Sequence, residues 1–140
     1  MDQSTQKTRI LVIDDDRRMR ELMREFLNDE GFEVSLSENG LEGLDDAKEL
    51  HPDLILLDLW LPGRSGEEVC KAIRGDDDER FRCTPILMVT GKDSDVDQVL
   101  GMVIGATGYL SKPFPMSVLL KEIQHCLDKK LERVEGIEPS

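Results

Sequence analysis

Short apolar runs alternate with amphipathic segments along this chain. A continuous apolar run favours a strand that is buried on both faces, whereas apolar residues spaced three and four apart favour a helix with one buried face. The predicted strands are Ile10–Ile13, Phe32–Leu36, Leu54–Leu57, Ile86–Val89 and Tyr109–Ser111. The predicted helices are Asp16–Glu30, Gly40–Leu50, Ser65–Arg74, Val96–Ile104 and Met116–Leu131. Strands that alternate with helices predict an α/β fold, in which helices cover both faces of a parallel sheet.

The residues that directly follow the predicted strands are polar or charged. They are Asp14–Asp16, Asp58, Thr90 and Lys112. Because ligands of such folds bind beyond the carboxyl ends of the strands, we expect these side chains to share one rim. Crowded carboxylates repel one another, and Mg²⁺ relieves this repulsion. A carboxylate beside Mg²⁺ can attack a phosphoryl group, while a lysine and a hydroxyl stabilise the phosphoryl oxygens.

Each of these groups has a simpler explanation when it is taken alone. The run Asp14–Asp16 fits a helix N-cap, and Asp58 fits an acid that caps a loop. Thr90 fits a strand-end hydroxyl with a local backbone bond, and Lys112 fits a solvated lysine. The joint placement of all four at the ends of different strands favours a common phosphoryl site.

Composition and charge narrow the possible functions. The chain has 140 residues and a formal net charge of −12. A protein that binds nucleic acid directly normally presents a basic face, so we expect no direct contact with DNA or RNA. No apolar run approaches the roughly 20 residues of a membrane span, and Met1–Arg9 lacks the apolar core of a signal peptide. We therefore expect a cytoplasmic protein.

Other potential ligands have ordinary structural explanations. The cysteines are scattered without a CxxC pair, so Cys70 and Cys126 are predicted to be small apolar groups in helices. His51 and His125 lack metal-ligand spacing and are predicted to lie at the surface. The charged segment Gly75–Cys83 is predicted to be a loop. Its acidic run lacks the spaced ligands and the turn glycine of a calcium loop, so we expect it to be solvated.

Four segments together resemble the receiver domain of bacterial two-component response regulators. They are Ile10–Asp15, Asp53–Gly66, Pro85–Gly91 and Gly105–Phe114. They occur in the family's order between about residue 9 and about residue 129. The resemblance implies a flavodoxin-like, doubly wound sheet of five parallel strands in the order 2-1-3-4-5, with five helices. It also implies a polar tail over residues 1–8, the receiver domain over 9–129, and the end of the last helix with a tail or linker over 130–140.

The resemblance implies a phosphoacceptor and a metal site. Asp58 would accept the phosphoryl group, and Mg²⁺ would be the cofactor. Asp15 would bind Mg²⁺ directly and Asp14 mostly through water. Asp58 and the backbone carbonyl of Trp60 would complete the protein ligands.

The resemblance also implies a switch. Thr90 and Lys112 would contact the phosphoryl group, and Tyr109 would turn inward as Thr90 moves. The bond between Lys112 and Pro113 would be cis. Asp16 has no role in the family and is predicted to start the first helix.

The implied function is signal transduction rather than catalysis on a separate substrate. A sensor histidine kinase or a histidine phosphotransfer protein would donate the phosphoryl group. The receiver would catalyse only its own phosphorylation and its slow dephosphorylation. The conformational change would control a partner protein or an output domain outside this chain.

Two further hypotheses concern lifetime and partners. Trp60 and Lys92 lie two residues after Asp58 and Thr90, at positions that border the path of the hydrolytic water in this family. Bulky Trp60 is predicted to shield the acyl phosphate, although it also fits a simple solvent-edge aromatic. The helix Val96–Ile104 has more apolar residues than one face can bury, which favours a dimer or partner surface between the fourth and fifth helices. Scattered exposed apolar residues are the alternative.

Two alternatives for the acidic rim stay open at this point. In a haloacid-dehalogenase-like phosphatase, Asp14 would be the nucleophile and Asp16 the acid and base. That assignment leaves Asp58 without its usual role, and the chain is short for such an enzyme. A degenerate receiver that acts only as an interaction module is the second alternative, and the intact acidic set argues against it. A flavodoxin is disfavoured because these acids would repel the FMN phosphate.

Overall fold

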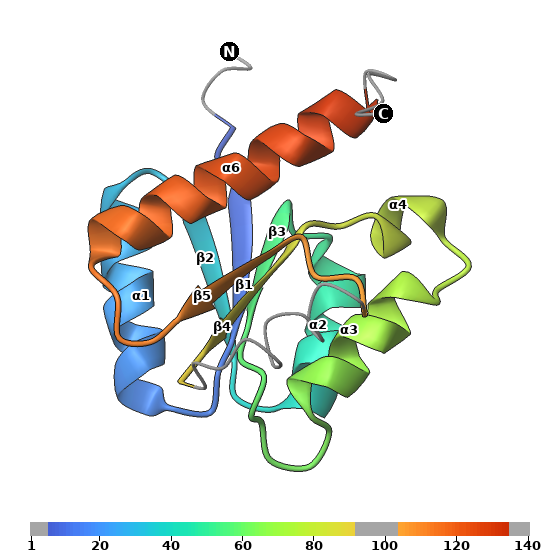
Figure 1. The fold of residues 1–140 in the computed structure, drawn as a ribbon, viewed down its shortest axis with the longest axis horizontal. Coiled ribbons are helices and arrows are strands. Elements are labelled where there is room, and N and C mark those ends of the chain that lie inside the picture. The colour runs from blue at the N-terminus through green and yellow to red at the C-terminus, as the bar shows by residue number, and fades with distance from the viewer. Residues whose placement is uncertain (1–5, 92–103, 135–140) are drawn as a thin grey trace.

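A parallel five-stranded sheet forms the centre of the computed structural model, which describes residues 6–91 and 104–134 (Figure 1). The strands are β1 (Arg9–Ile13), β2 (Glu33–Ser37), β3 (Leu54–Leu57), β4 (Ile86–Thr90) and β5 (Gly108–Ser111). The described helices are α1 (Arg17–Asp29), α2 (Gly40–Leu50), α3 (Gly66–Arg74), α4 (Glu79–Arg82) and α6 (Met116–Val134). All strand pairs are parallel, and their order is β2-β1-β3-β4-β5. The predicted sheet and its strand order are confirmed.

Two apolar clusters cover the two faces of the sheet. Alternate residues of a strand point to opposite faces, so the central strands β1, β3 and β4 contribute to both clusters. One cluster contains Leu11, Ile13, Ile55, Leu57, Ile86 and Met88, together with apolar residues of α2, α3 and α4. The other contains Ile10, Val12, Leu54, Leu56, Leu87 and Val89, together with apolar residues of α1 and α6. Figure 1 shows α1 and α6 on one side of the sheet and α2 and α3 on the other.

Polar side chains fix the starts of the helices beside the sheet. Asp16 accepts hydrogen bonds from the backbone N–H groups of Arg18 and Met19, so it caps α1 as predicted. Ser65 and Glu68 form a reciprocal capping box at the start of α3. These caps set where each helix begins after the loop at the carboxyl end of its strand.

The prediction of a loop over Gly75–Cys83 is wrong in part, because α4 forms within it. Asp78 caps this short helix, and Phe81 is buried in the cluster beneath α2 and α3. The acidic run is also more than a solvated loop. Asp76 accepts a hydrogen bond from the N–H of Asp78 and lies 3.8 Å from the Lys48 ammonium. One buried aromatic residue outweighs the local polarity because its burial removes a large apolar surface from water.

Other boundaries differ by a few residues, and several predictions concern residues that the structure does not describe. β2 begins and ends one residue later than expected, and α6 continues to Val134. The predicted helix Val96–Ile104 falls outside the described residues except for Ile104, which packs partly buried against the α2–α3 side. Its partner surface is therefore not described here. Cys70 and Cys126 are buried, and both histidines are exposed, as predicted. None of the helices described is long and apolar enough to cross a membrane.

Candidate functional site

The acidic rim forms because neighbouring strands end in register. Ile13 of β1 pairs with Leu57 of β3, so the next residues, Asp14 and Asp58, leave the sheet side by side. The N–H of Asp58 donates to the carbonyl of Ile13 at 3.0 Å, which holds the two strand ends together. One carboxylate oxygen from each of Asp14, Asp15 and Asp58 lies within 4.8 Å of the others. The sequence prediction that these acids meet at one edge is confirmed.

Asp14 is the most completely bonded residue of this group. It is 2% exposed. Its N–H donates to the carbonyl of Ser37 at 3.1 Å, and its own carbonyl accepts from Nη1 of Arg20 at 2.8 Å. Its Oδ1 accepts from the N–H of Asp16 at 2.9 Å, and its Oδ2 accepts from Nζ of Lys112 at 2.8 Å. A buried carboxylate is stable only when its oxygens are satisfied in this way.

Asp15 differs from Asp14 in both exposure and bonding. Its side chain is exposed, and no described residue donates a hydrogen bond to its carboxylate. Asp15 therefore keeps its oxygens available for a cation, whereas each oxygen of Asp14 already accepts a hydrogen bond.

Asp58 lies between a backbone donor and a cation. It is 7% exposed. Oδ1 accepts from the N–H of Trp60 at 3.1 Å, and Oδ2 lies 3.6 Å from Nζ of Lys112. Burial raises the pKa of Asp58, with smaller contributions from the charges of Asp14 and Asp15, while the Trp60 N–H and Lys112 oppose the rise. A bound cation would favour the ionised carboxylate.

Lys112 supplies the only described ammonium that pairs with the acidic cluster. Burial alone lowers the pKa of Lys112, but the hydrogen bond to Asp14 and the charges of Asp14 and Asp58 raise it overall. Lys112 is therefore charged at neutral pH. The bond between Lys112 and Pro113 is cis, as the resemblance implied.

The donor set fits Mg²⁺. This ion prefers six oxygen ligands at about 2.0–2.1 Å and usually retains several waters beside one or two carboxylates. Two ligands on one such ion lie at most about 4.2 Å apart, so the carboxylates need only a small contraction or one bridging water. Each oxygen of Asp14 accepts a hydrogen bond from the protein, whereas Asp15 accepts none from the described residues, so Asp15 is the better placed of the two for a direct bond to the ion.

Three of the remaining predicted residues belong to strands β4 and β5 and to the loop after β3. Thr90 ends β4 and pairs with Ser111, which directly precedes Lys112, although the Thr90 side chain is outside what the structure describes. Trp60 is 55% exposed in the loop that follows Asp58. Tyr109 of β5 is partly buried against the cluster on the α2–α3 side. Lys92 falls outside the described residues, so the structure does not describe its place.

Two contributors to the site were missed from the sequence. Gly66 lies so close to the loop after β3 that an added Cβ would collide with the carbonyl oxygen of Asp58. Arg20 binds the carbonyl of Asp14 from the first turn of α1. The glycine that directly follows the capping residue Ser65 was a sequence signal of this close approach. Nothing in the local sequence distinguishes Arg20 from the other arginines of α1.

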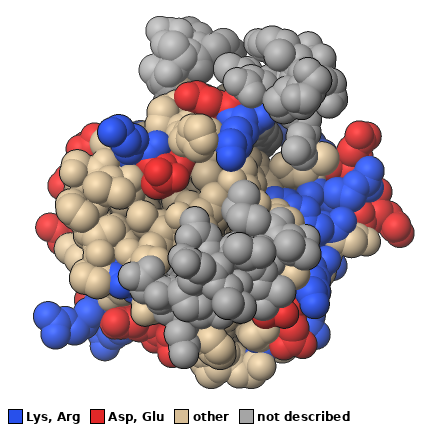
Figure 2. Space-filling model, in the orientation of Figure 1, with Lys and Arg blue, Asp and Glu red and all other residues tan. Residues whose placement is uncertain are grey.

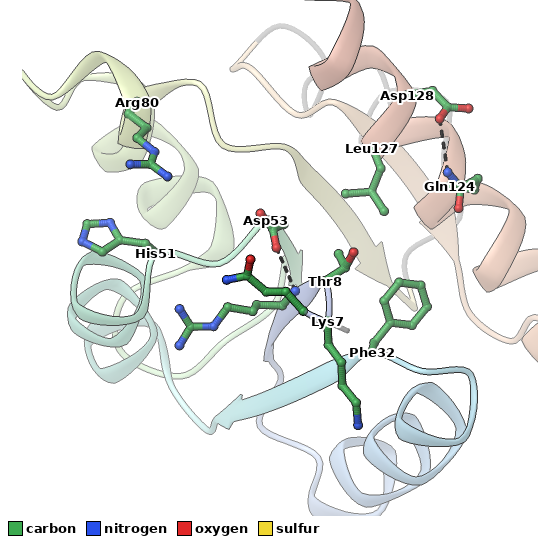
Figure 3. Close-up of a pocket in the computed structure, with 11 residues that line it drawn as sticks. Lys7, Thr8, Phe32, His51, Asp53, Arg80, Gln124, Leu127 and Asp128 are labelled. Carbon is green, nitrogen blue, oxygen red and sulfur yellow. Dashed lines mark hydrogen bonds between the residues drawn. The ribbon is translucent and has the colours of Figure 1, made fainter. Parts of the chain in front are cut away.

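One hollow of the described surface lies away from this rim. It has a volume of about 830 Å³, and residues that precede β1 and β3, including Thr8 and Asp53, line it beside α6 (Figure 3). Its lining mixes Arg80 and Lys7 with Asp53 and Asp128, so no single charge dominates. The acidic cluster is at the opposite end of these strands. On the described part of the face in Figure 2, basic side chains lie beside acidic ones.

Comparison with known protein sequences identifies one family. Residues 10–124 match the family described as response regulator receiver domain. The chain is 41% identical over 120 residues to the DNA-binding response regulator MtrA of Mycobacterium tuberculosis H37Rv, covering 86% of this chain and 50% of MtrA. It is 43% identical over 122 residues to the transcriptional regulatory protein ResD of Bacillus subtilis, covering 86% and 48%. The chain thus spans about half the length of these relatives.

Solved structures agree with the sequence comparison. The chemotaxis response regulator CheY4 of Vibrio cholerae superposes with a TM-score of 0.80 at 35% identity, covering 86% of this chain and 99% of CheY4. A CheY-like receiver domain protein from Methanospirillum hungatei superposes with a TM-score of 0.83 at 29% identity, covering 91% and 99%. The fold is therefore shared with both of these solved structures over nearly the whole of each solved chain.

Proposed function

The chain belongs to the response regulator receiver domain family, and we propose that it receives a phosphoryl group on Asp58 in a Mg²⁺-dependent reaction. The observation that carries this proposal is the position of Asp58. Its two oxygens face the Trp60 N–H and the Lys112 ammonium, and the carboxylates of Asp14 and Asp15 lie beside it. As a receiver domain the chain is a regulatory protein rather than a classical enzyme.

The proposed donor is a phosphohistidine on a sensor histidine kinase or a histidine phosphotransfer protein. An oxygen of the Asp58 carboxylate attacks phosphorus, and a P–O bond forms as the P–N bond breaks. The electron pair of the broken bond stays on the histidine nitrogen, which takes a proton from solvent. The product is an acyl phosphate on Asp58.

The residues of the rim share the work of this transfer. Asp15, Asp58 and the Trp60 carbonyl would hold Mg²⁺, with Asp14 acting mostly through water. When bound, Mg²⁺ neutralises charge on the phosphoryl oxygens and aligns them for attack. Lys112 is charged and lies 3.6 Å from Asp58, so it pairs with a phosphoryl oxygen after a small movement.

Phosphorylation is proposed to shift an equilibrium between two arrangements of the β4 and β5 ends. The new group carries about −1.5 to −2 charges and three acceptor oxygens. Thr90 and Lys112 would contact it, and Tyr109 would turn further inward as Thr90 moves. Only contacts that differ between the two arrangements drive such a shift. Water attack on the acyl phosphate would reverse it.

The output of the switch is proposed to lie outside residues 9–129, which we assign as the receiver unit. Relatives of twice the length include a DNA-binding regulator, so an output domain after a linker that starts near residue 130 is one form of output. A separate partner or a second copy, bound through the surface between residues 96–104 and α6, is the other. We propose that these steps take place in the cytoplasm.

The phosphatase alternative is not favoured. It requires the carboxylate of Asp16 to act as acid and base, but that carboxylate caps α1 through the N–H groups of Arg18 and Met19. It also leaves Asp58 without a role, although Asp58 lies between the Trp60 N–H and the Lys112 ammonium and beside the carboxylates of Asp14 and Asp15. A degenerate receiver is disfavoured because Asp58 and its three charged neighbours are all present.

Labelling with a small acyl phosphate tests the proposal. Acetyl phosphate and Mg²⁺ are expected to add one phosphoryl group, which mass spectrometry maps to Asp58. The label is expected to disappear with a chelator and in Asp58→Asn, and to persist in Asp77→Asn, which changes an exposed acid away from the rim.

Other outcomes distinguish the alternatives. A label on Asp14 would support the phosphatase. The absence of label from both acetyl phosphate and a phosphohistidine donor would contradict phosphoacceptor function and support the interaction module.

A further inference from the structure

The side chain of Arg20, in α1, packs against the acidic rim instead of projecting into solvent. Arg17 is 82% exposed and pairs with Glu21 on its own helix. Arg20, by contrast, is 13% exposed, and its Nη1 donates to the carbonyl oxygen of Asp14 at 2.8 Å. A largely buried guanidinium is costly unless it is hydrogen-bonded, so this contact is a strong constraint on the loop.

The contact holds the peptide unit that joins Asp14 to Asp15. The N–H of Asp14 is held separately, because it donates to the carbonyl of Ser37. Backbone donors and acceptors are therefore fixed on both sides of the Asp14 Cα. The orientation of the peptide unit between Asp14 and Asp15 helps to set the direction in which the Asp15 side chain projects.

Asp15 depends on this backbone because nothing else described here holds its side chain. Its carboxylate is exposed and accepts no hydrogen bond from the described residues, yet one of its oxygens lies within 4.8 Å of oxygens of Asp14 and Asp58. By contrast, Lys112 and the N–H of Asp16 hold the carboxylate of Asp14 directly. Loss of the Arg20 contact would leave the Asp14 carboxylate in place and free the peptide unit that precedes Asp15, so that only the bond from the Asp16 N–H to Asp14 would still hold the backbone of Asp15.

Arg20 also connects this loop to the loop after β2. Its Nη2 lies 3.7 Å from Oε2 of Glu38, which is 65% exposed. Glu38 follows Ser37, the residue that accepts from the N–H of Asp14. Because exposed ion pairs contribute little, the hydrogen bond to the Asp14 carbonyl carries the main constraint.

We propose that Arg20 is a positioning residue for the cation site: it fixes the peptide between Asp14 and Asp15 so that the Asp15 carboxylate faces Asp58. This inference rests on the proposed function, because it assigns Asp15 as a direct ligand of Mg²⁺. Arg20 acts through the backbone and touches neither the cation nor the phosphoryl group.

A purely electrostatic role of Arg20 and a positioning role predict opposite changes in Mg²⁺ affinity when Arg20 is replaced. A guanidinium near the rim repels a second cation, so a purely electrostatic role predicts tighter Mg²⁺ binding when Arg20 is removed. A positioning role predicts weaker binding, and residues that orient a metal ligand typically change affinity by about 10–100-fold.

The test is a Mg²⁺ titration of the full chain that follows the fluorescence of its single tryptophan, Trp60, whose N–H binds Asp58. Arg20→Met is expected to weaken Mg²⁺ binding by about tenfold or more. Arg20→Lys keeps the positive charge and hydrogen-bond donors on a shorter side chain, and its Mg²⁺ affinity is expected to fall between that of Arg20→Met and that of the unchanged chain. Arg17→Met is the matched control on the same helix and is expected to stay within about twofold of the unchanged chain, since a surface change away from the site has little effect.

A second readout separates positioning from general damage. The Mg²⁺ concentration that half-saturates labelling of Asp58 is expected to rise in Arg20→Met by the same factor as the dissociation constant. The maximal labelling rate at saturating Mg²⁺ is expected to stay within about twofold, because the chemical groups are all present. If Arg20→Met does not fold, the Mg²⁺ affinity of Arg20→Lys is compared with that of Arg17→Lys instead.

Two kinds of failure are distinguishable. Unchanged or tighter Mg²⁺ binding in the Arg20 variants overturns the positioning role, while labelling of Asp58 in the unchanged chain still supports the receiver function. Failure of the unchanged chain to bind Mg²⁺ or to be labelled overturns the proposed function itself.

Discussion

The ammonium of Lys112 is hydrogen-bonded to Asp14 at 2.8 Å, and it lies 3.6 Å from the carboxylate that we propose as phosphoacceptor. Lys112 thus neutralises the most buried carboxylate of the rim and remains close to Asp58. The same side chain is therefore placed both to stabilise the acidic cluster and to pair with a phosphoryl group on Asp58. This double placement leads to the first prediction.

Lys112→Met is expected to separate cation binding from phosphoryl transfer. Mg²⁺ binding is expected to become tighter, because an ammonium no longer repels the second cation. The labelling of Asp58 is expected to slow by about 10²–10³-fold, the usual cost of removing one group that stabilises developing charge. Trp60 fluorescence and labelling kinetics measure the two effects. Lys121→Met changes an exposed lysine of α6 and serves as control. Weaker Mg²⁺ binding in Lys112→Met would refute the assigned electrostatic role.

Trp60→Asn is expected to shorten the lifetime of the acyl phosphate. The indole is 55% exposed in the loop that directly follows Asp58, where it can obstruct an approaching water molecule. The decay of phosphorylated protein, followed by intact-mass spectrometry after removal of the donor, measures the lifetime. Trp60→Phe keeps a bulky ring and is expected to decay at a rate close to that of the unchanged chain. Equal or slower decay in the asparagine variant would show that Trp60 is only a solvent-edge aromatic.

Gly66→Ala is expected to destabilise the protein and disturb Asp58. The added Cβ would collide with the carbonyl oxygen of Asp58 and approach Cα of Leu59 to 2.8 Å. Such overpacking typically costs about 1–3 kcal/mol of unfolding free energy. Urea unfolding measures this loss, and labelling measures the disturbance of Asp58. Gly91→Ala is the control, because no atom of the described residues lies within 4 Å of its added Cβ. A loss in Gly66→Ala no larger than in Gly91→Ala would contradict the close approach.

The three thiols are expected to react unequally in the native protein. Burial raises the pKa of Cys126 to about 11 and also raises the pKa of Cys70, whereas Cys83 is partly exposed. At about pH 8, iodoacetamide is expected to modify only Cys83 in the native protein and all three thiols in urea, because only accessible thiolates react. Mass spectrometry counts the modified thiols. Rapid native modification of Cys126 would contradict its burial.

The raised pKa of Cys126 also predicts how stability depends on pH. Between the ordinary thiol pKa of 9.0 and about 11, the native state holds a proton that the unfolded state releases. The unfolding free energy contributed by this group is therefore fully present below about pH 9 and falls as the pH rises through that window. The difference between urea unfolding of the unchanged chain and of Cys126→Ala, followed with pH, isolates this effect.

Much of the fold was readable from the sequence because its signals are local. Runs such as Leu54–Leu57 are apolar throughout, since helices cover both faces of the sheet. The short helix α4 was missed because a single aromatic residue, Phe81, drives its burial within a charged segment. No local periodicity signals an element of one turn.

The sequence by itself determined which groups reach the rim, because Asp14 and Asp58 directly follow strands whose carboxyl ends must meet at one edge of a parallel sheet. Only the tertiary structure decided that Lys112 bonds to Asp14 and that Arg20 binds the carbonyl of Asp14. It also decided that burial raises the pKa of Asp58. These features depend on packing between segments that are distant along the chain, as for Lys112 and Asp14, or on a helix that folds back over a loop, as for Arg20. Local residue patterns do not encode the distances between atoms of such segments.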